Sequence, residues 1–340
     1  MIRAGIVGLG RWGRSLVNAV ASKNGNAGDD ICFVRAATRT RADAEEFCRD
    51  RRIVLADSYE EILRASDIDA VVLATPHSQH RAQALAAIAA GKHVFVEKPL
   101  TLDYASALLV ADAARRAELV LAVGFARRFH PSIVELRLRA RDGRLGDIVA
   151  MVAQHTTSTV QFIAPDNWRA SAAEAPGGAF TAVGVHSLDH MIEFAGRVRD
   201  VRAVTARNYP GPSDDTTTVM LRFEGGATGL IFCSVATATN FELTAYGTKG
   251  LAEISRTDLS RFRFAPTATA APAGAVPAPP DEILQFPGFD LLHAEMIAFA
   301  RAIRDGAPYP VPLADVLHGM AVFDAVVESA KRGEIVAVRN

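Results

Sequence analysis

The sequence predicts a doubly wound α/β domain at the N-terminus followed by an α+β domain. Two observations lead to this fold class. The 340 residues exceed the usual size of one domain, because a domain typically holds roughly 150 residues. The pattern also changes near Gly124: before it, apolar runs alternate with alanine-rich stretches, and after it strand-like runs follow one another. We therefore expect domains at 1–124 and 125–340.

The first domain shows the alternation of a parallel sheet with crossover helices. Five of its strand-like runs end in IVG, VRAAT, AVVLATP, HVFVEKP and LVLAVGF, and we count six strands in all. Ser78 and Asp103 are expected as helix N-caps and Gly91 as a stop. The helices are predicted over 14–21, 42–52, 78–90 and 103–117.

The second domain is expected to begin with a helix and continue with strands. The helix is predicted over 131–141, and the strand-like runs cover 148–157, 201–207, 216–223 and 229–235. The Pro- and Ala-rich stretch 265–282 is predicted to be an extended surface loop without a catalytic role. Helices over 291–304 and 314–331, the second stopped by Gly333, are expected to pack back towards the N-terminal domain.

Composition and charge exclude several classes of protein. Hydrophobic residues make up 49% and charged residues 22%, as in an ordinary globular protein. The formal charge is -1 and no long basic run is present, so nucleic acid is not expected as a partner. No apolar run approaches the length of a membrane span. The three scattered cysteines form no metal-binding pair and indicate a reducing compartment, so we expect a cytoplasmic protein.

A glycine-rich loop follows the first strand. Gly8 permits a tight turn, Gly10 allows the backbone to approach a diphosphate, and Gly13 allows the helix to pack on the strand. Arg11 and Trp12, which lie between these glycines, are expected to contact the cofactor as well, and the free N–H groups and dipole of the helix that follows favour phosphate. The loop therefore predicts a dinucleotide site; the alternative is a glycine-rich turn with no ligand.

The end of the second strand indicates which dinucleotide is bound. Enzymes that use NAD commonly place an acid there, but residues 36–41 contain none. Thr38 and Arg39 suit a 2′-phosphate, because a guanidinium binds phosphate through charge-assisted hydrogen bonds. NADP(H) is favoured and NAD(H) is possible; the alternative is that Arg39 and Arg41 are solvated loop charges.

Several motifs together resemble the Gfo/Idh/MocA oxidoreductase family, which includes glucose-fructose oxidoreductase and inositol dehydrogenase. The resemblance runs nearly end to end, and Glu-Lys-Pro after a strand is its most specific part. The motifs are GxGRWG at residues 8–13, ATPHSQH at 74–80, EKP at 97–99, GFARRFHP at 124–131, Trp168-Arg169 shortly before Gly177-Gly178, and GVHSLD at 184–189.

The resemblance implies a Rossmann domain followed by a domain with a large open, mainly antiparallel sheet. That sheet often forms the oligomer face in the family, so we expect a homodimer or homotetramer. A nicotinamide would lie between the domains, with a small sugar, polyol or related alcohol above it.

The resemblance also assigns catalytic roles. Lys98, at the end of the fifth strand, would hydrogen-bond the reacting hydroxyl, and His186 would act as general acid/base. The family places an Asp four residues before that histidine, where this chain has Ala182. Asp189 is considered as its replacement, because it lies three residues after His186 on the expected helix.

Other positions follow from the same motifs. His186, Asp189 and His190 superficially suggest a metal site, because two imidazoles one helical turn apart can share an ion, but no further ligand is evident and no metal is expected. His77 is expected to contact the nicotinamide ribose, and His80 to cap the following helix or pack against it. Cofactor contacts are expected from Thr75, Pro76, His77, His80, Glu97 and Lys98, and substrate contacts from Arg127, Arg128, Trp168, Arg169 and Asp189. The alternative is that the three arginines hold the domain interface by ion pairs and that Trp168 belongs to the core.

These observations predict an NAD(P)-dependent oxidoreductase that acts on a small sugar, polyol or cyclic alcohol or its ketone. One alternative is a glycosidase of the same family that retains its NAD. The other is a binding protein that senses NADP(H) and has lost its chemistry together with the aspartate at position 182.

Overall fold

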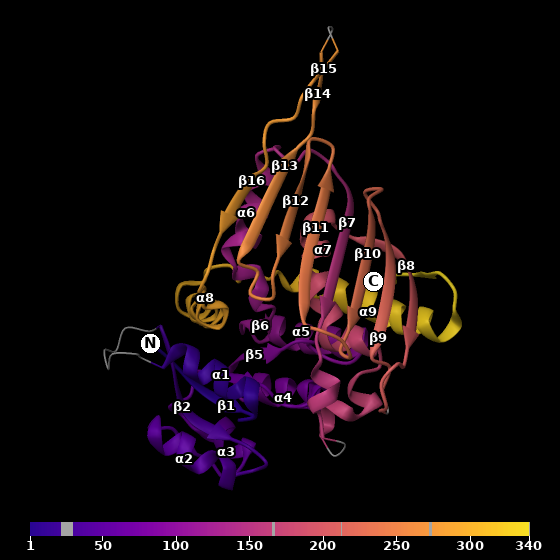
Figure 1. The fold of residues 1–340 in the computed structure, drawn as a ribbon. Coiled ribbons are helices and arrows are strands. Elements are labelled where there is room, and N and C mark those ends of the chain that lie inside the picture. Colours follow the sequence, from indigo (N-terminus) through magenta and orange to yellow (C-terminus); the bar gives the residue numbers. More distant parts are fainter. Residues whose placement is uncertain (22–29, 165–166, 212, 272–273, 340) are drawn as a thin grey trace. The chain divides into compact units, whose positions relative to one another are not determined.

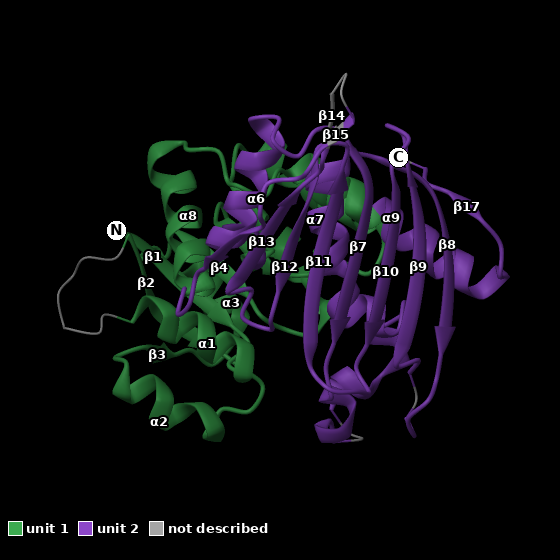
Figure 2. Cartoon of the chain, turned by 45° about the horizontal axis from the view of Figure 1, so that its top comes forward, with its two compact units in different colours: residues 1–126, 290–320 green, residues 127–289, 321–340 purple. Residues whose placement is uncertain are grey.

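The computed structural model describes residues 1–21, 30–164, 167–211, 213–271 and 274–339. The chain forms two compact units, coloured separately in Figure 2. The first consists of Met1–Ala126 and Asp290–Met320, and the second of Arg127–Phe289 and Ala321–Asn340. The first boundary lies two residues beyond the expected one, but residues 290–320 cluster with the first unit and not with the second.

The first unit contains the predicted six-stranded parallel sheet (Figure 1). Its strand order, β3-β2-β1-β4-β5-β6, is that of a Rossmann fold. Strand β3 has only two residues and helix α3 six, too few to show a periodic pattern. The strands are β1 (Ile2–Val7), β2 (Ile31–Ala37), β3 (Val54–Leu55), β4 (Ala70–Leu73), β5 (His93–Glu97) and β6 (Leu121–Gly124).

The helices of the first unit begin close to the predicted positions. Asp103 caps its helix as expected, accepting a hydrogen bond from the Ser106 N–H. The prediction of Ser78 as a cap is wrong: the helix already begins at His77, because Pro76 sets the extended entry to it. The helices are α1 (Arg11–Val20), α2 (Ala42–Asp50), α3 (Tyr59–Arg64), α4 (His77–Ala89), α5 (Tyr104–Arg116), α8 (Leu291–Asp305) and the first part of α9 (Leu313–Arg332).

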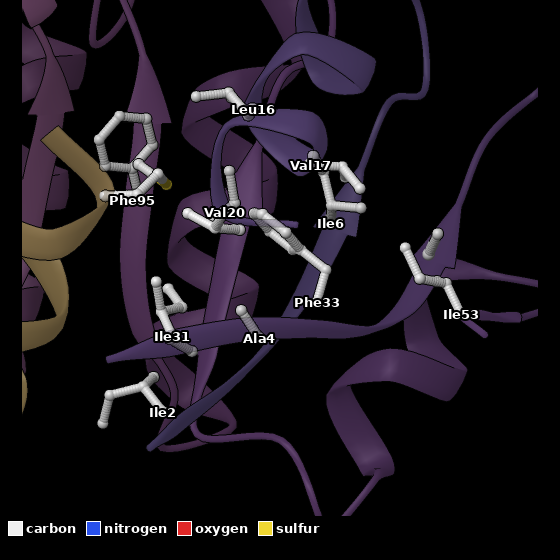
Figure 3. Packing of buried hydrophobic residues seen from close by; sticks show 14 of the residues in the cluster. Ile2, Ala4, Ile6, Leu16, Val17, Val20, Ile31, Phe33, Ile53 and Phe95 are labelled. Atoms are coloured by element: carbon white, nitrogen blue, oxygen red, sulfur yellow. The ribbon is translucent and has the colours of Figure 1, made fainter. Parts of the chain in front are cut away.

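The core of the first unit is completed by a helix that comes late in the sequence. The apolar side chains of β1, β2 and α1, several of which Figure 3 shows, form one cluster with Met296, Phe299 and Ala300 of α8. The rings of Phe95 on β5 and Phe299 meet edge to face at 5.6 Å. This packing explains why residues 290–320 belong to the first unit.

The second unit is built on a nine-stranded sheet in the order β16-β13-β12-β11-β7-β10-β9-β8-β17. Its pairs are antiparallel except β7 with β10, so the predicted mainly antiparallel sheet is confirmed. Its strands are β7 (Ile148–Thr156), β8 (Val198–Ala206), β9 (Thr216–Phe223), β10 (Thr228–Ser234), β11 (Asn240–Gly247), β12 (Gly250–Ser255), β13 (Arg261–Pro266), β16 (Glu282–Gln285) and β17 (Val336–Ala337).

The stretch 265–282 is more ordered than the predicted loop. Strand β13 extends into it, β16 begins at its end, and β14 (Thr269–Ala271) pairs with β15 (Gly274–Val276). Alternation is hard to read here because alanine and proline dominate the sequence. Residues 272 and 273 lie outside the described part of the chain.

Two helices of the second unit, α6 (Pro131–Arg141) and α7 (Val185–Ala195), pack against its sheet. Helix α7 is entered through a π-helical turn, Phe180–Gly184, which the sequence did not predict. None of the helices in the described residues combines the length and apolar character needed to cross a membrane.

Candidate functional site

The glycine loop between β1 and α1 is a tight turn. Gly8 has a φ of +97°, and a Cβ there would lie 2.5 Å from the Ala74 carbonyl oxygen. A Cβ on Gly13 would lie 1.9 Å from the Gly8 carbonyl oxygen, so no larger residue fits while α1 stays against β1. Gly10, by contrast, faces open space: a methyl group added there would meet no atom within 4 Å. Gly8 and Gly13 therefore shape the loop, whereas Gly10 leaves room beside it.

The N-terminus of α1 is suited to an anion. Gly10 is its N-cap, no side chain caps it, and its first turn contains no acidic residue. The first intrahelical hydrogen bond runs from the Arg14 N–H to the Gly10 carbonyl, which leaves the N–H groups of Arg11, Trp12 and Gly13 outside the helix ladder. These features fit a dinucleotide diphosphate.

The two arginines of the loop after β2 have different surroundings. Arg41 is occupied: it donates to the Leu55 and Ala56 carbonyls and lies 3.1 Å from Asp57. Arg39 is exposed, and within the described residues its side chain has no hydrogen bond or ion pair. Thr38 beside it is half-buried. Arg39 is therefore the cation of this loop that is available to a phosphate.

His80 connects the loops that follow β4 and β5. Its side chain is fully buried in α4, with Nδ1 2.9 Å from the Pro99 carbonyl oxygen and Nε2 3.1 Å from the Thr75 carbonyl oxygen. His77 is only half-buried and meets the His80 ring edge-on at 5.8 Å. The Thr75 hydroxyl donates to Gln83 at 2.6 Å. His80 thus packs within the helix and holds two loops at the ligand-binding edge of the sheet.

Lys98 directly follows β5 at this edge. Its side chain is half-buried, and the Lys98–Pro99 peptide bond is cis. Glu97 is buried beside Gly124 of the neighbouring strand, where a Cβ would lie 3.0 Å from Oε1 of Glu97. The first unit therefore brings the glycine loop, residues 75–77 and Lys98 to the carboxyl ends of its strands.

In the second unit His186 lies at the start of α7. Ala182, at the position where the resemblance implies an aspartate, is in the π-helical turn that precedes this helix. The His186 ring centroid lies 6.0 Å from that of His155 on β7. His155 was missed by the sequence analysis, because nothing distinguishes it from other residues of an alternating strand.

Asp189 is bound to Arg128 in a buried ion pair. Arg128 Nε donates to Asp189 Oδ2 at 2.9 Å, and Nη2 donates to Oδ1 at 2.8 Å. Glu193 lies 3.7 Å from Arg128 and pairs with Arg137. Since both carboxylate oxygens of Asp189 accept from Arg128, this pair joins α7 to the residues before α6.

Arg127 has a different environment from Arg128. Its Nη2 donates to His155 Nε2 at 3.1 Å, and its guanidinium lies 4.3 Å above the Phe241 ring. Burial lowers the pKa of Arg127 to about 10. Because a guanidinium only donates, His155 accepts at Nε2 and donates from Nδ1 to the Val183 carbonyl, at 3.1 Å.

Trp168, Arg169 and His190 complete the predicted residues of the second unit. Arg169 stacks on Trp168 at 4.2 Å in a short 3₁₀ turn. His190 is fully buried, and burial together with the nearby Arg128 cation holds its pKa well below the usual value. In the described residues no three His, Cys, Asp or Glu side chains are grouped closely enough to hold a metal ion.

A Rossmann unit with a glycine loop at the sheet edge, joined to an α+β unit, defines a dinucleotide-binding protein of two units. Residues 2–125 match the model of the "Oxidoreductase family, NAD-binding Rossmann fold", and residues 133–253 match the GFO/IDH/MocA C-terminal domain. The chain therefore belongs to the Gfo/Idh/MocA family of NAD(P)-dependent oxidoreductases, as its motifs predicted.

Similar proteins include trans-1,2-dihydrobenzene-1,2-diol dehydrogenase of Oryctolagus cuniculus, 31% identical over 65% of this chain and 66% of that protein. The rhizopine catabolism protein MocA of Rhizobium meliloti is 26% identical over 97% of this chain and 95% of its own. Levoglucosan dehydrogenase in complex with NADH and L-sorbose has the same fold, with a TM-score of 0.88, 22% identity and coverage of 100% and 99%. The matches to the dihydrodiol dehydrogenases thus span about two thirds of those proteins' length.

Proposed function

We propose that this protein is an NADP(H)-dependent dehydrogenase that acts on a small sugar, polyol or cyclic alcohol and its ketone. The observation that carries the proposal is the dinucleotide cradle of the first unit. Gly10 leaves space at an uncapped helix N-terminus, and Arg39 stands exposed after a strand whose end has no acid. The relatives named dihydrodiol dehydrogenase support alcohol oxidation as the reaction class.

The preference for NADP(H) follows from charge. A carboxylate at the end of β2 would bind the ribose hydroxyls of NAD but would repel a 2′-phosphate. Here Thr38 offers a hydroxyl and Arg39 a guanidinium that no ion pair occupies in the described residues. We therefore assign the 2′-phosphate to Arg39, and the diphosphate to the N–H groups at the start of α1.

Lys98 and His186 are the residues that we assign to the proton chemistry. When bound, the nicotinamide ring would accept the hydride that the alcohol loses. Lys98, which directly follows β5 at the carboxyl edge of the sheet, would orient the substrate hydroxyl through a hydrogen bond. His186 would take the hydroxyl proton as the alcohol becomes a ketone, and return it in the reverse direction.

Neither alternative function is favoured by the comparisons. The named relatives include dehydrogenases, and none of those described above is a glycosidase or a sensor. A cofactor-retaining glycosidase would resist removal of its dinucleotide, whereas a sensor would bind NADPH without turnover. Both properties are measured in the test below.

The first test is calorimetric titration of the cofactor-stripped protein with NADPH and with NADH. Tighter binding of NADPH is expected, and binding of neither would contradict the proposed function. Lys98→Ala should then abolish NADP⁺ reduction by a substrate alcohol while NADPH affinity stays nearly unchanged. Full activity of this variant would overturn the assignment of Lys98.

We also propose that the open sheet of the second unit forms a homodimer or homotetramer in the cytoplasm. Its outer face exposes apolar side chains: Met220 on β9 is 60% exposed and lies directly opposite Leu230 on β10, and Val204 on β8 is 62% exposed. Contiguous exposed apolar surface indicates an interface. Met220→Lys should shift the mass measured by light scattering towards the monomer; an unchanged mass would contradict this interface.

A further inference from the structure

The residues around α6 and α7 carry more positive than negative charge. Arg128 is neutralised by Asp189, and Arg137 is neutralised by Glu193. Arg127, which precedes them in sequence, has no carboxylate within ion-pair distance in the described residues. A buried charge is normally paired, because leaving water costs free energy that an opposite charge must offset. Arg127 therefore lacks the counterion that its neighbours have.

The Arg127 guanidinium is held in a fixed orientation. Phe241 lies beneath it and His155 accepts from Nη2, while Nη1 is buried and has no hydrogen-bond partner within the part of the chain that the structure describes. Buried guanidinium N–H groups are nearly always satisfied by an acceptor. Two contacts thus position the group, and Nη1 is a donor that has no acceptor among the described residues.

The surroundings of Arg127 define the charge of that ligand. His155 is neutral, because it accepts from Arg127 at Nε2 and donates at Nδ1. His190 is buried among these arginines and is neutral as well. Among the described residues no ion pair offsets the positive charge of Arg127, and a carboxylate, with its single negative charge, would balance it.

Arg127 lies near the proposed general base, His186, with His155 between them. His155, which Arg127 contacts, has its ring 6.0 Å from that of His186. An anion held at Nη1 would therefore lie within one small molecule's length of the proposed general base.

We propose that Arg127 binds the carboxylate of the substrate, so that the enzyme acts on a polyhydroxy acid such as a sugar acid. This inference rests on the proposed dehydrogenase function. Arg127 is the residue that would select acids over the corresponding neutral sugars.

The test compares matched acid and neutral ligands. D-Glucuronate is paired with D-glucose, and D-galacturonate with D-galactose, and binding is measured by calorimetry with and without saturating NADP⁺. At least one acid should bind roughly 10- to 100-fold more tightly than its neutral partner, the effect of one charge-assisted hydrogen bond. Arg127→Gln should remove this preference, and Arg127→Lys should retain part of it.

The control variant is Arg141→Gln, which removes an exposed arginine at the end of α6, the helix that follows Arg127, and should leave the acid preference unchanged. Equal binding of acids and neutral sugars would overturn the inference. So would an Arg127→Gln variant that loses affinity equally for both, because Arg127 would then only support His155. These outcomes are independent of the proposed function, which fails separately if NADPH itself does not bind.

Discussion

Two glycines of the same loop should respond in opposite ways to the addition of one methyl group. In Gly10→Ala the new Cβ meets no atom within 4 Å, and the φ of -68° suits any residue. The weaker helix cap and the lower entropy of the unfolded chain offset each other to within about 0.5 kcal/mol. The melting temperature should therefore change by less than about 2 °C.

In Gly13→Ala the new Cβ would lie 1.9 Å from the Gly8 carbonyl oxygen, whereas contacts under 3.0 Å are essentially never found. Helix α1 would have to move away by roughly 1 Å to bring this contact to 3.0 Å, and by about 1.5 Å to bring it to ordinary van der Waals distance at 3.4 Å. Such overpacking against backbone atoms costs about 1–3 kcal/mol. This variant should unfold at a clearly lower temperature.

The assay combines thermal unfolding with calorimetric titration of NADPH. Gly10→Ala should fold normally but bind NADPH roughly 10- to 100-fold more weakly, because the methyl group occupies the space needed by a phosphate. If Gly10→Ala binds NADPH as tightly as the unaltered protein, the assignment of this loop as the diphosphate site is wrong.

Three further predictions concern the cofactor, the buried ion pair and the response to acid. Arg39→Glu should weaken NADPH binding by roughly 10-fold or more without weakening NADH binding. The control Arg116→Glu, on the exposed end of α5, should change the binding of neither cofactor. Equal losses for both cofactors in titrations would contradict the 2′-phosphate assignment. Asp189→Ala removes both carboxylate hydrogen bonds to the buried Arg128. Urea unfolding should therefore show a loss of about 3 kcal/mol, and a loss under about 1 kcal/mol would refute a structural role. Burial lowers the pKa of His130, so the unfolded chain binds this proton more readily and stability falls as pH drops below about 6.5. His130→Asn, which keeps an acceptor for the Ser132 N–H, should lose less stability between neutral and acidic pH. A pH profile identical to that of the unaltered protein would argue against this contribution.

Local parts of the structure could be predicted from the sequence. The turn at Gly8 and the placement of Lys98 after β5 depend on a strand, a few loop residues and the start of the next segment. Their signals are therefore short and contiguous. The parallel sheet with crossover helices follows from the same alternation of strand-like and helical runs.

Contacts between distant residues could not be predicted in this way. The pair between Arg128 and Asp189 joins positions 61 residues apart, and the bond between Arg127 and His155 joins positions 28 apart. Periodicity identifies which face of a strand is buried but not which residue lies opposite it. The two adjacent arginines looked equivalent in the sequence, and only their partners distinguish a neutralised cation from one that lacks a counterion.

Because α8 comes late in the sequence, it affects how the chain folds during synthesis and where the chain can be cut into fragments. During synthesis the cofactor-binding sheet emerges first, yet Leu16, Val17 and Phe95 remain without part of their covering until Phe299 has been added. Nascent chains would expose apolar surface throughout translation of the second unit, a state that favours chaperone binding. A fragment cut at residue 126, or a chimera that exchanges only the N-terminal segment, would inherit the same uncovered surface, so an autonomous cofactor domain has to include Leu291–Asp305.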